Sequence, residues 1–346
     1  MNSSVRSPGR PGRFLAVAVL AAASCVAATL VTAGGAATAS AVRPAAPHAP
    51  RAAARAADGR IAFSQWDLLP GSDLSHHSNV YTIRPDGTGL RQLTKVGKAK
   101  AAASPSWSPG GARIAYESNQ TGDYRIWVMK SDGSGKRRLT NDPDFADLQP
   151  DWSPDGTHIL FSRCDDHLGF IAQCDLDVIS AAGTGMRRLA GGHWTYVHGE
   201  YSPDGQHIVV SADRGGFLSA LWVMRSNGTG LHRITRPSLE AFWPAWSPNG
   251  RRIVFSDNCC QLGSNVWTVH PDGTGLTKLT HLHPPVEADF ASYSPSGRQI
   301  VLHSTGKCPV RGICAYFYVM NADGSGLHPV HTGVANTFLT DWGRPR

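Results

Sequence analysis

The feature that most constrains the fold is a turn motif that recurs six times along the 346-residue chain. Its copies read PDGTGLRQLT from Pro85, SDGSGKRRLT from Ser131, AAGTGMRRLA from Ala181, SNGTGLHRIT from Ser226, PDGTGLTKLT from Pro271 and ADGSGLHPV from Ala322. The first glycine of the motif recurs every 45 to 51 residues. Repeats of this length are typical of solenoids and propellers.

A second motif alternates with the first and shows what each repeat contains. It reads SWSPGGARIAYES from Ser106, DWSPDGTHILFS from Asp151, EYSPDGQHIVVSA from Glu200, AWSPNGRRIVFSD from Ala245 and SYSPSGRQIVLHS from Ser292. Asp-Gly and Asn-Gly pairs between short apolar segments indicate hairpins. Each repeat therefore has four short strands: A through the Trp or Tyr, B through the IxFS segment, C through the VWxV segment and D through LxxLT. Four strands per repeat predict a propeller blade.

The two ends of the repeat region predict how the ring closes. The segment Asp58–Ser64 matches strand B without a preceding strand A, and Thr340-Asp341-Trp342 matches a strand A. We therefore expect an all-β fold, a six-bladed β-propeller of four-stranded antiparallel blades whose C-terminal strand completes the first blade and leaves no open edge. The repetition of Ser153 and Asp155 favours a role in turns over catalysis.

The N-terminus predicts export. Arg6, Arg10 and Arg13 precede an apolar, Ala-rich stretch and small-residue cleavage sites, so residues 1–41 are expected to be a signal peptide. A single membrane anchor is the alternative for this stretch. Residues 42–57 are expected to be a low-complexity Pro/Ala/Arg linker, and residues 58–346 the propeller. The mature chain is expected to have no membrane span and to be secreted or in the cell envelope.

The net charge of +7 does not indicate a nucleic-acid partner. Six of the 33 Lys and Arg residues lie before Asp58, where there are no acids, which leaves 27 basic against 26 acidic residues in the repeats. The repeat region is nearly neutral, so its net charge does not predict binding to phosphate backbones.

Six cysteines lie in three close pairs within loops that join strands B and C. In an exported chain, disulfides are expected for Cys164 with Cys174 and Cys308 with Cys314. Cys259 and Cys260 are adjacent in the chain, at a Cα separation of ~3.8 Å, below the usual range for a bridge. A strained vicinal disulfide and pairing with another loop or chain both remain open for them. Zinc is disfavoured because no CxxC or HxxxH spacing accompanies these cysteines.

Strand alternation assigns the loops to two rims. The A–B and C–D turns share one rim and repeat closely, whereas the B–C and D–A loops on the other rim are irregular. Irregular loops on a rigid scaffold are where binding groups gather, so this second rim is expected to carry function. Inner strands A bring polar and aromatic residues toward the axis, and the candidate ligand-binding residues are Gln149, Asp151, His198, Glu200, Trp243 and Asp341. These groups could instead be solvated channel residues that satisfy buried strand ends.

A cation site is a further candidate. Asp165, Asp166, Asp175 and Asp177 flank the loop between Cys164 and Cys174, and such oxygens suit calcium, although the D-x-D-x-D-G pattern is absent. No other cofactor is indicated, since nucleotide-binding and zinc-protease motifs are missing.

The repeated pattern WSPDG…IxFxS…VWxM…DGTG…LT resembles the propeller repeat of the periplasmic protein TolB and of the propeller domains of prolyl-oligopeptidase-type enzymes. The resemblance covers residues 58–346 and implies the fold, without implying a particular activity. TolB has an α/β domain before its propeller, where this sequence has the linker. The peptidases add a hydrolase domain with a G-x-S-x-G motif, which this sequence lacks.

These observations favour an exported, non-catalytic scaffold that binds a protein or glycan partner outside the cytoplasm through the rim of B–C and D–A loops. The alternative is a carbohydrate-active hydrolase or lyase that uses Asp151, Glu200 and His198 in the channel, because paired carboxyl groups can act as acid and base.

Overall fold

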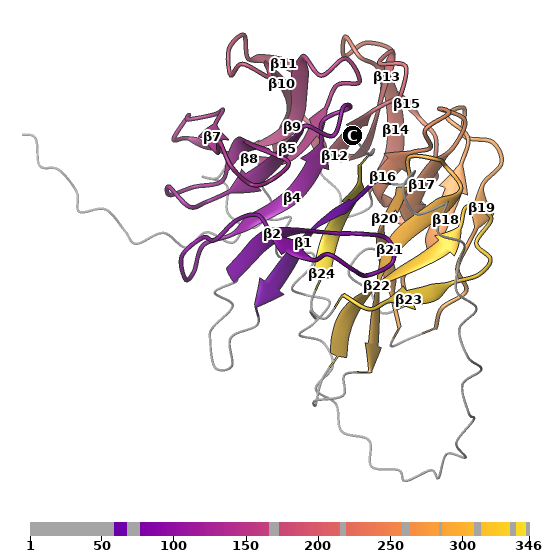
Figure 1. Ribbon diagram of the computed structural model, residues 1–346. Coiled ribbons are helices and arrows are strands. Elements are labelled where there is room, and N and C mark those ends of the chain that lie inside the picture. The colour runs from indigo at the N-terminus through magenta and orange to yellow at the C-terminus, as the bar shows by residue number, and fades with distance from the viewer. Residues whose placement is uncertain are drawn as a thin grey trace, which may run out of the picture.

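The chain folds into six four-stranded antiparallel sheets. The computed structural model describes residues 59–67, 77–165, 173–214, 219–257, 263–283, 286–307, 313–332 and 337–343. These residues form 24 strands and one short 3-10 turn, η2 (Pro237–Leu239). The sheets stand around a common axis as the blades of a propeller (Figure 1). The predicted all-β, six-bladed fold is confirmed.

Each blade consists of strands that are consecutive in the chain, except the first. Blade 1 contains β24 (Thr337–Trp342), β1 (Ile61–Asp67), β2 (His77–Ile83) and β3 (Arg91–Gln92). Blade 2 contains β4 (Ala102–Trp107), β5 (Arg113–Ser118), β6 (Arg125–Lys130) and β7 (Arg137–Arg138). Blade 3 contains β8 (Phe145–Trp152), β9 (His158–Asp165), β10 (Cys174–Ser180) and β11 (Arg187–Ala190).

The other three blades repeat this order. Blade 4 contains β12 (Thr195–Tyr201), β13 (His207–Asp213), β14 (Ala220–Arg225) and β15 (His232–Arg233). Blade 5 contains β16 (Phe242–Trp246), β17 (Ile253–Ser256), β18 (Val266–Val269) and β19 (Thr277–Lys278). Blade 6 contains β20 (Ala288–Tyr293), β21 (Gln299–Lys307), β22 (Ile313–Asn321) and β23 (His328–Val330).

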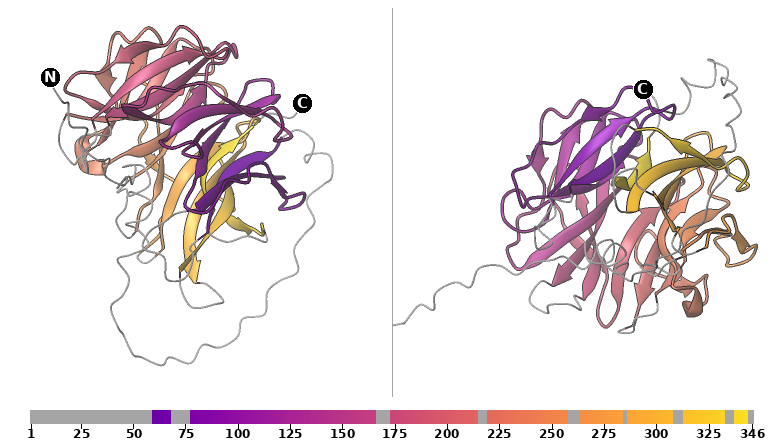
Figure 2. Two further views of the ribbon diagram at one scale, coloured as in Figure 1. Left: turned by 90° about the vertical axis from the view of Figure 1, so that its left-hand side faces the viewer. Right: turned by 90° about the horizontal axis from the view of Figure 1, so that it is seen from below.

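The C-terminal strand closes the ring as predicted. Strand β24 pairs antiparallel with β1, with Trp342 opposite Ile61 and Asp341 opposite Ala62. Figure 2 shows the yellow C-terminal strand beside the indigo first strand. This pairing gives β1 a partner on both sides, so the first blade has four strands like the other five.

The Ser-Pro-Asp-Gly segments form the turns between strands A and B. In blade 3 the hydroxyl of Ser153 donates to Asp155 Oδ1 over 2.6 Å and accepts from the backbone N–H of His158 over 2.9 Å. Hydrogen bonds from Ser153 and Thr157 lower the pKa of Asp155 to about 2. Gly156 has φ of +70°, which a glycine adopts without strain. Ser153 and Asp155 are thus parts of the turn, as the repetition predicted.

The core lies between the blades. Trp246 of blade 5 packs in one cluster with Val209 and Leu221 of blade 4 and Phe255 of its own blade. Five further clusters likewise join the remaining pairs of neighbouring blades. Because flat rings fill the wedge between two twisted sheets, each aromatic residue of strand A ties its blade to the preceding one.

Candidate functional site: an axial cavity lined by the inner strands

Each inner strand of blades 2 to 6 bends at one residue, three positions before its aromatic residue. The ladder between strands A and B has an irregularity at this point in each blade. The residues there have positive φ angles: Ser104 (48°), Gln149 (55°), His198 (55°), Trp243 (51°) and Phe290 (52°). Positive φ is unfavourable for non-glycine residues, above all for bulky ones. The packed ring holds these residues in that conformation and places all five on the wall of an axial cavity.

The cavity has a volume of about 340 Å³ and occupies the part of the channel near the A–B turns. Pro109, Pro154 and Pro203 of these turns line its mouth. Trp243 and Phe290 lie at its inner end, with ring centroids 4.1 Å apart, and belong to an apolar cluster around the axis. All six candidate ligand-binding residues, Gln149, Asp151, His198, Glu200, Trp243 and Asp341, line this one cavity.

The location of this cavity differs from the expected functional rim. The sequence indicated the rim of B–C and D–A loops, whereas the cavity opens toward the near-identical A–B turns. Most of the irregular B–C loop residues fall outside the described residues. The rim prediction therefore stays a prediction.

The three acidic residues of the wall join neighbouring blades. Asp341 Oδ2 accepts a hydrogen bond from the backbone N–H of Trp107 over 2.6 Å. Asp151 Oδ2 accepts from Tyr201 N–H over 2.9 Å, and Glu200 Oε1 accepts from Trp246 N–H over 2.8 Å. In each pair the acid belongs to one blade and the aromatic residue to the next. These carboxyl groups therefore satisfy buried strand ends, which is the structural role weighed as the alternative.

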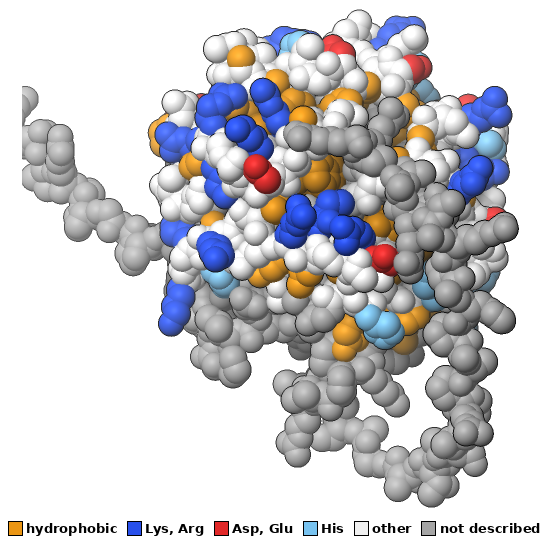
Figure 3. Space-filling model, viewed as in Figure 1, with side chains coloured by type: hydrophobic (Ala, Val, Ile, Leu, Met, Phe, Trp, Pro, Cys, Tyr) orange, Lys and Arg blue, Asp and Glu red, His pale blue; other side chains and the backbone are white. Residues whose placement is uncertain are grey.

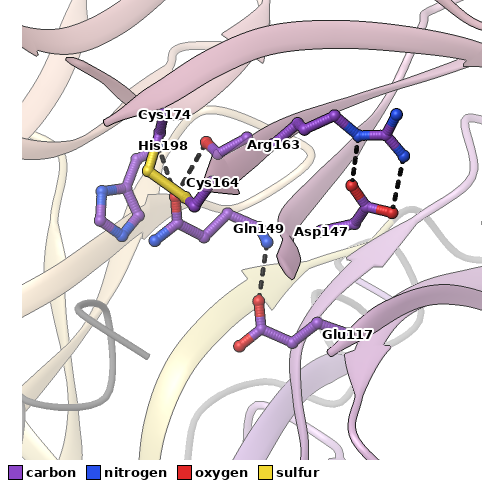
Figure 4. The surroundings of a disulfide bond; sticks show 8 residues. Glu117, Asp147, Gln149, Arg163, Cys164, Cys174 and His198 are labelled. Carbon is purple, nitrogen blue, oxygen red and sulfur yellow. Dashed lines mark hydrogen bonds and ion pairs between the residues drawn. A yellow bond between two sulfur atoms is a disulfide. The ribbon is translucent and has the colours of Figure 1, made fainter. Parts of the chain in front are cut away.

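A second layer of polar contacts lies deeper in the wall. Glu117 Oε2 accepts from the backbone N–H of Gln149 over 2.7 Å, and Gln149 Oε1 accepts from His198 N–H over 2.9 Å and from the Ser162 hydroxyl over 3.1 Å (Figure 4). Glu117 was not among the site residues predicted from the sequence. Its signal was present, because Glu117 stands in strand B where the other blades have Ser or His.

Burial controls the protonation of these groups. It raises the pKa of Asp151 to about 8 and that of Glu117 to about 7. It raises the pKa of Asp341 to about 6 and that of Glu200 well above its usual value, and Asp151 and Glu200 each also feel repulsion from the other acids. Burial lowers the pKa of His198 to about 3, so its imidazole is neutral at neutral pH. Among the described residues, the cavity wall thus carries partly protonated acids and no Lys or Arg.

The aspartates of the suggested calcium site are distributed differently. Asp175 forms an ion pair with Arg188 over 2.9 Å, and Asp177 lies 3.9 Å from Arg163. Asp165 is at the end of β9, and Asp166 is outside the described residues. Within the described part of the chain, no group of three or more His, Cys, Asp or Glu side chains is arranged to hold a metal ion. Two of the four aspartates thus face arginines.

One cysteine pair forms a disulfide as predicted. Cys164 and Cys174 are directly opposite in the β9–β10 ladder and are bonded. Cys259, Cys260 and Cys308 lie outside the described residues, and nothing is described for the side chain of Cys314. The predictions for those four cysteines remain predictions.

The fold and the axial cavity define a six-bladed β-propeller whose ring is closed by its own C-terminal strand. More specifically, its repeats are similar to those of TolB: residues 69–182 match the family model described as TolB beta propeller domain. Over 86 residues it is 34% identical to the Tol-Pal system protein TolB of Anaeromyxobacter dehalogenans (strain 2CP-C), which covers 25% of this chain and 19% of that protein. Over 107 residues it is 33% identical to the uncharacterized peptidase YuxL of Bacillus subtilis (strain 168), covering 30% of this chain and 16% of that protein.

A solved structure extends the likeness to nearly the whole propeller. The crystal structure of TolB from Acinetobacter baumannii superposes with a TM-score of 0.64 at 18% sequence identity, over 82% of this chain and 66% of that one. At this identity the likeness concerns the fold alone. The chain spans about a fifth or less of the length of the two curated relatives, so their activities and partners do not transfer with the repeat. In the described residues, no helix is long and apolar enough to cross a bilayer.

Proposed function

We propose that this protein is an exported, non-catalytic propeller of the cell envelope that binds a partner in its axial cavity. The observation that carries the proposal is the preformed cavity of about 340 Å³ at the mouth of a closed ring. Its size is that of a small-ligand pocket. It suits a protruding loop or chain end of a protein, or one or two sugar units, better than a whole domain.

The hydrogen bonding of the acids supports binding over catalysis. Asp151, Glu200 and Asp341 each use a carboxyl oxygen to satisfy a backbone N–H of the next blade. A catalytic base has to change its protonation and its hydrogen bonds during each turnover. Groups that hold the ring together are poorly placed for such changes, whereas polar groups in fixed positions are well suited to recognition.

The lining indicates the chemistry of the partner. Acids, amides, indoles and prolines line the cavity, and its wall contains no Lys or Arg in the part of the chain that the structure describes. A partner that brings hydrogen-bond donors, an ammonium group or a guanidinium group complements this wall, and an anionic partner does not. Both a protein segment and a glycan can bring such donors. The Tol-Pal system named for one relative favours a protein segment.

Export and location remain part of the proposal. The basic and apolar start of the sequence and the disulfide between Cys164 and Cys174 both suit an oxidising compartment outside the cytoplasm. A search for the mature N-terminus by mass spectrometry of envelope and culture fractions tests this part. A chain that still begins at Met1 and remains in the cytoplasm contradicts it.

The binding proposal is tested by capture with the purified protein. Envelope proteins are cross-linked and captured with the wild-type chain and with the variant Asp151→Asn, His198→Gln, Glu200→Gln, and both proteins are applied to a glycan array. We expect the cavity variant to remain folded and to bind its partner with a Kd that is tenfold or more higher than that of the wild type. The matched control, Asp272→Asn with Asp323→Asn, changes two exposed turn acids and should bind like the wild type. Full binding by the cavity variant contradicts the proposal.

A carbohydrate hydrolase or lyase is the second candidate. The observation in its favour is the pKa of about 8 for Asp151, which keeps a proton available at neutral pH as a general acid requires. Glu200 and His198 are the other residues that such an activity needs. Assay of the purified protein against neutral and acidic oligosaccharides, with Asp151→Asn as control, separates the candidates. Turnover that disappears in the variant supports the enzyme.

A further inference from the structure

Three arginines meet on one face of blade 1. The ladder places Ile61 opposite Ile83 and Thr82 opposite Arg91. Arg60 precedes Ile61 and Arg84 follows Ile83, so these two arginines are opposite each other at the ends of β1 and β2. Since side chains alternate along strands, Arg84 and Thr82 share a face, and Arg91 joins them from β3. Figure 3 shows Lys and Arg side chains gathered over the first blades of the chain.

Arg60 is held in a fixed position. Its Nε donates to the Thr82 hydroxyl over 3.1 Å, and its terminal nitrogen donates to the Thr82 carbonyl over 3.1 Å and to the Gly89 carbonyl. A Cβ atom added to Gly89 would lie 3.0 Å from a terminal nitrogen of Arg84 and 3.5 Å from one of Arg60. The two guanidinium groups therefore meet above the backbone of Gly89.

The arginines have no acidic partner among the described residues. Neither Arg60, Arg84 nor Arg91 forms an ion pair there, and Arg84 donates only to Thr88 over 3.4 Å. Burial lowers the pKa of Arg60, and Arg91 and Arg84 lower it further. Like charges on directly opposite strand positions destabilise a sheet. The cluster is thus an electrostatic cost to the fold with most of its guanidinium donors free.

Among the other blades, blade 2 also has basic residues at the three equivalent positions, Arg113, Lys130 and Arg137. Blade 6 has Gln299, Asn321 and His328 at these positions. In blade 2, however, the guanidinium of Arg137 points to blade 3, where it donates to the carbonyls of Ala181 and Ala182 over 2.8 and 2.9 Å. What distinguishes blade 1 is that its arginines lie close enough together to lower the pKa of Arg60, instead of bonding to a neighbouring blade.

We propose that Arg60, Arg84 and Arg91 bind a phosphate-type oxyanion on the turn rim of blade 1. A tetrahedral oxyanion accepts several N–H bonds at once and would neutralise the repulsion among the three guanidinium groups. The same chemistry occurs in free phosphate and in the headgroup of an anionic lipid, and the site recognises the feature that they share. This site is separate from the axial cavity, and the binding proposed there does not depend on it.

The test uses the purified protein and two probes. Inorganic phosphate is titrated at constant ionic strength and followed by phosphorus NMR, and vesicles of phosphatidylglycerol are compared with vesicles of phosphatidylcholine by sedimentation. We expect binding of at least one of phosphate and phosphatidylglycerol, weakened roughly three- to tenfold by Arg91→Gln or Arg84→Gln and further by the two together. Arg91 is exposed and makes no hydrogen bond among the described residues, so Arg91→Gln should fold normally.

The control is Arg138→Gln, an exposed arginine on the outer strand of blade 2. It should change binding by less than twofold. Binding of phosphate alone identifies a soluble phosphate as the source, and binding of phosphatidylglycerol vesicles alone identifies a lipid headgroup. The proposal is overturned if neither probe binds, if Arg91→Gln and Arg84→Gln have no effect, or if Arg138→Gln weakens binding as much as they do, since equal effects indicate diffuse charge.

Discussion

Asp341 Oδ2 lies 2.6 Å from the backbone nitrogen of Trp107, and this hydrogen bond connects residues that are 234 positions apart in the chain. Asp341 belongs to β24, the strand that completes blade 1. Trp107 is the last residue of β4, the inner strand of blade 2. The bond therefore joins the closing strand to the next blade at the axis. Closure of the ring and formation of the cavity wall depend on the same residue.

We predict that Asp341→Ala destabilises the protein by about 1–3 kcal/mol, because it leaves a largely buried N–H without an acceptor. Deletion of residues 340–346 should cost more and promote aggregation, since it exposes the inner edge of β1. Urea unfolding and size-exclusion chromatography measure both effects. Asp323→Ala, in an exposed turn, and removal of residues 42–57 are the controls and should change stability by less than about 1 kcal/mol. A harmless deletion of 340–346 would show that β24 does not close the ring.

Stability should fall as the pH rises from about 4 to about 8. Burial raises the pKa of Asp289 to about 8, and it raises those of Asp151, Glu117 and Asp341 to about 8, 7 and 6. The folded state therefore keeps protons that the unfolded state has lost in this window, and each such group contributes a slope of up to roughly 1.4 kcal/mol per pH unit. His198 and His303, with pKa values lowered to about 3, act in the opposite direction below pH 6.5.

Asp289→Asn tests this pH dependence at one site. Asp289 is 3% exposed, and Asn imitates its protonated form. The variant should lose part of the stability decrease between pH 5 and pH 8, as measured by urea unfolding at several pH values. Asp132 lies in an exposed turn and its pKa is lowered, so Asp132→Asn should leave the slope of stability against pH unchanged in that window. An identical slope in Asp289→Asn and wild type contradicts the prediction.

The buried ion pair of blade 3 should be costly to break. Arg163 donates to both carboxyl oxygens of Asp147, over 2.7 and 3.1 Å, and the Asp147 side chain is fully buried (Figure 4). Arg163→Met should destabilise by about 3–5 kcal/mol because it leaves buried acids without their cation. Addition of Asp147→Leu should restore part of that loss. A double-mutant cycle measures the coupling, and additive effects of the two changes would mean that the pair is not coupled.

Loss of the disulfide should have a moderate effect. Cys164 and Cys174 are separated by 10 positions, and a bridge over so short a loop contributes about 2–3 kcal/mol. The variant Cys164→Ser, Cys174→Ser should be less stable than the wild type by this amount in urea without reductant. Any further loss of stability when reductant is added to the variant indicates disulfide bonds among the other cysteines. Equal stability of variant and wild type would argue against the bridge.

The repeat motifs alone determined the number of blades, their four-strand order, the turn role of Ser153 and Asp155, and closure by Trp342. These features could be predicted because turn chemistry and strand alternation act between residues that are close in the chain. The same sequence signals also recur in each repeat. The pairing of Cys164 with Cys174 could be predicted for the same reason. The six residues proposed for the channel followed from their positions relative to the aromatic residue of strand A.

Only the tertiary structure decided how those residues are used. The bonds from Asp151, Glu200 and Asp341 to the next blade, and the contact of Glu117 with Gln149, depend on how separate sheets face each other across the axis. The same is true of the side of the channel on which the cavity opens. The meeting of Arg60, Arg84 and Arg91 depends on strand register, because a shift by one residue would turn each side chain to the other face of the sheet.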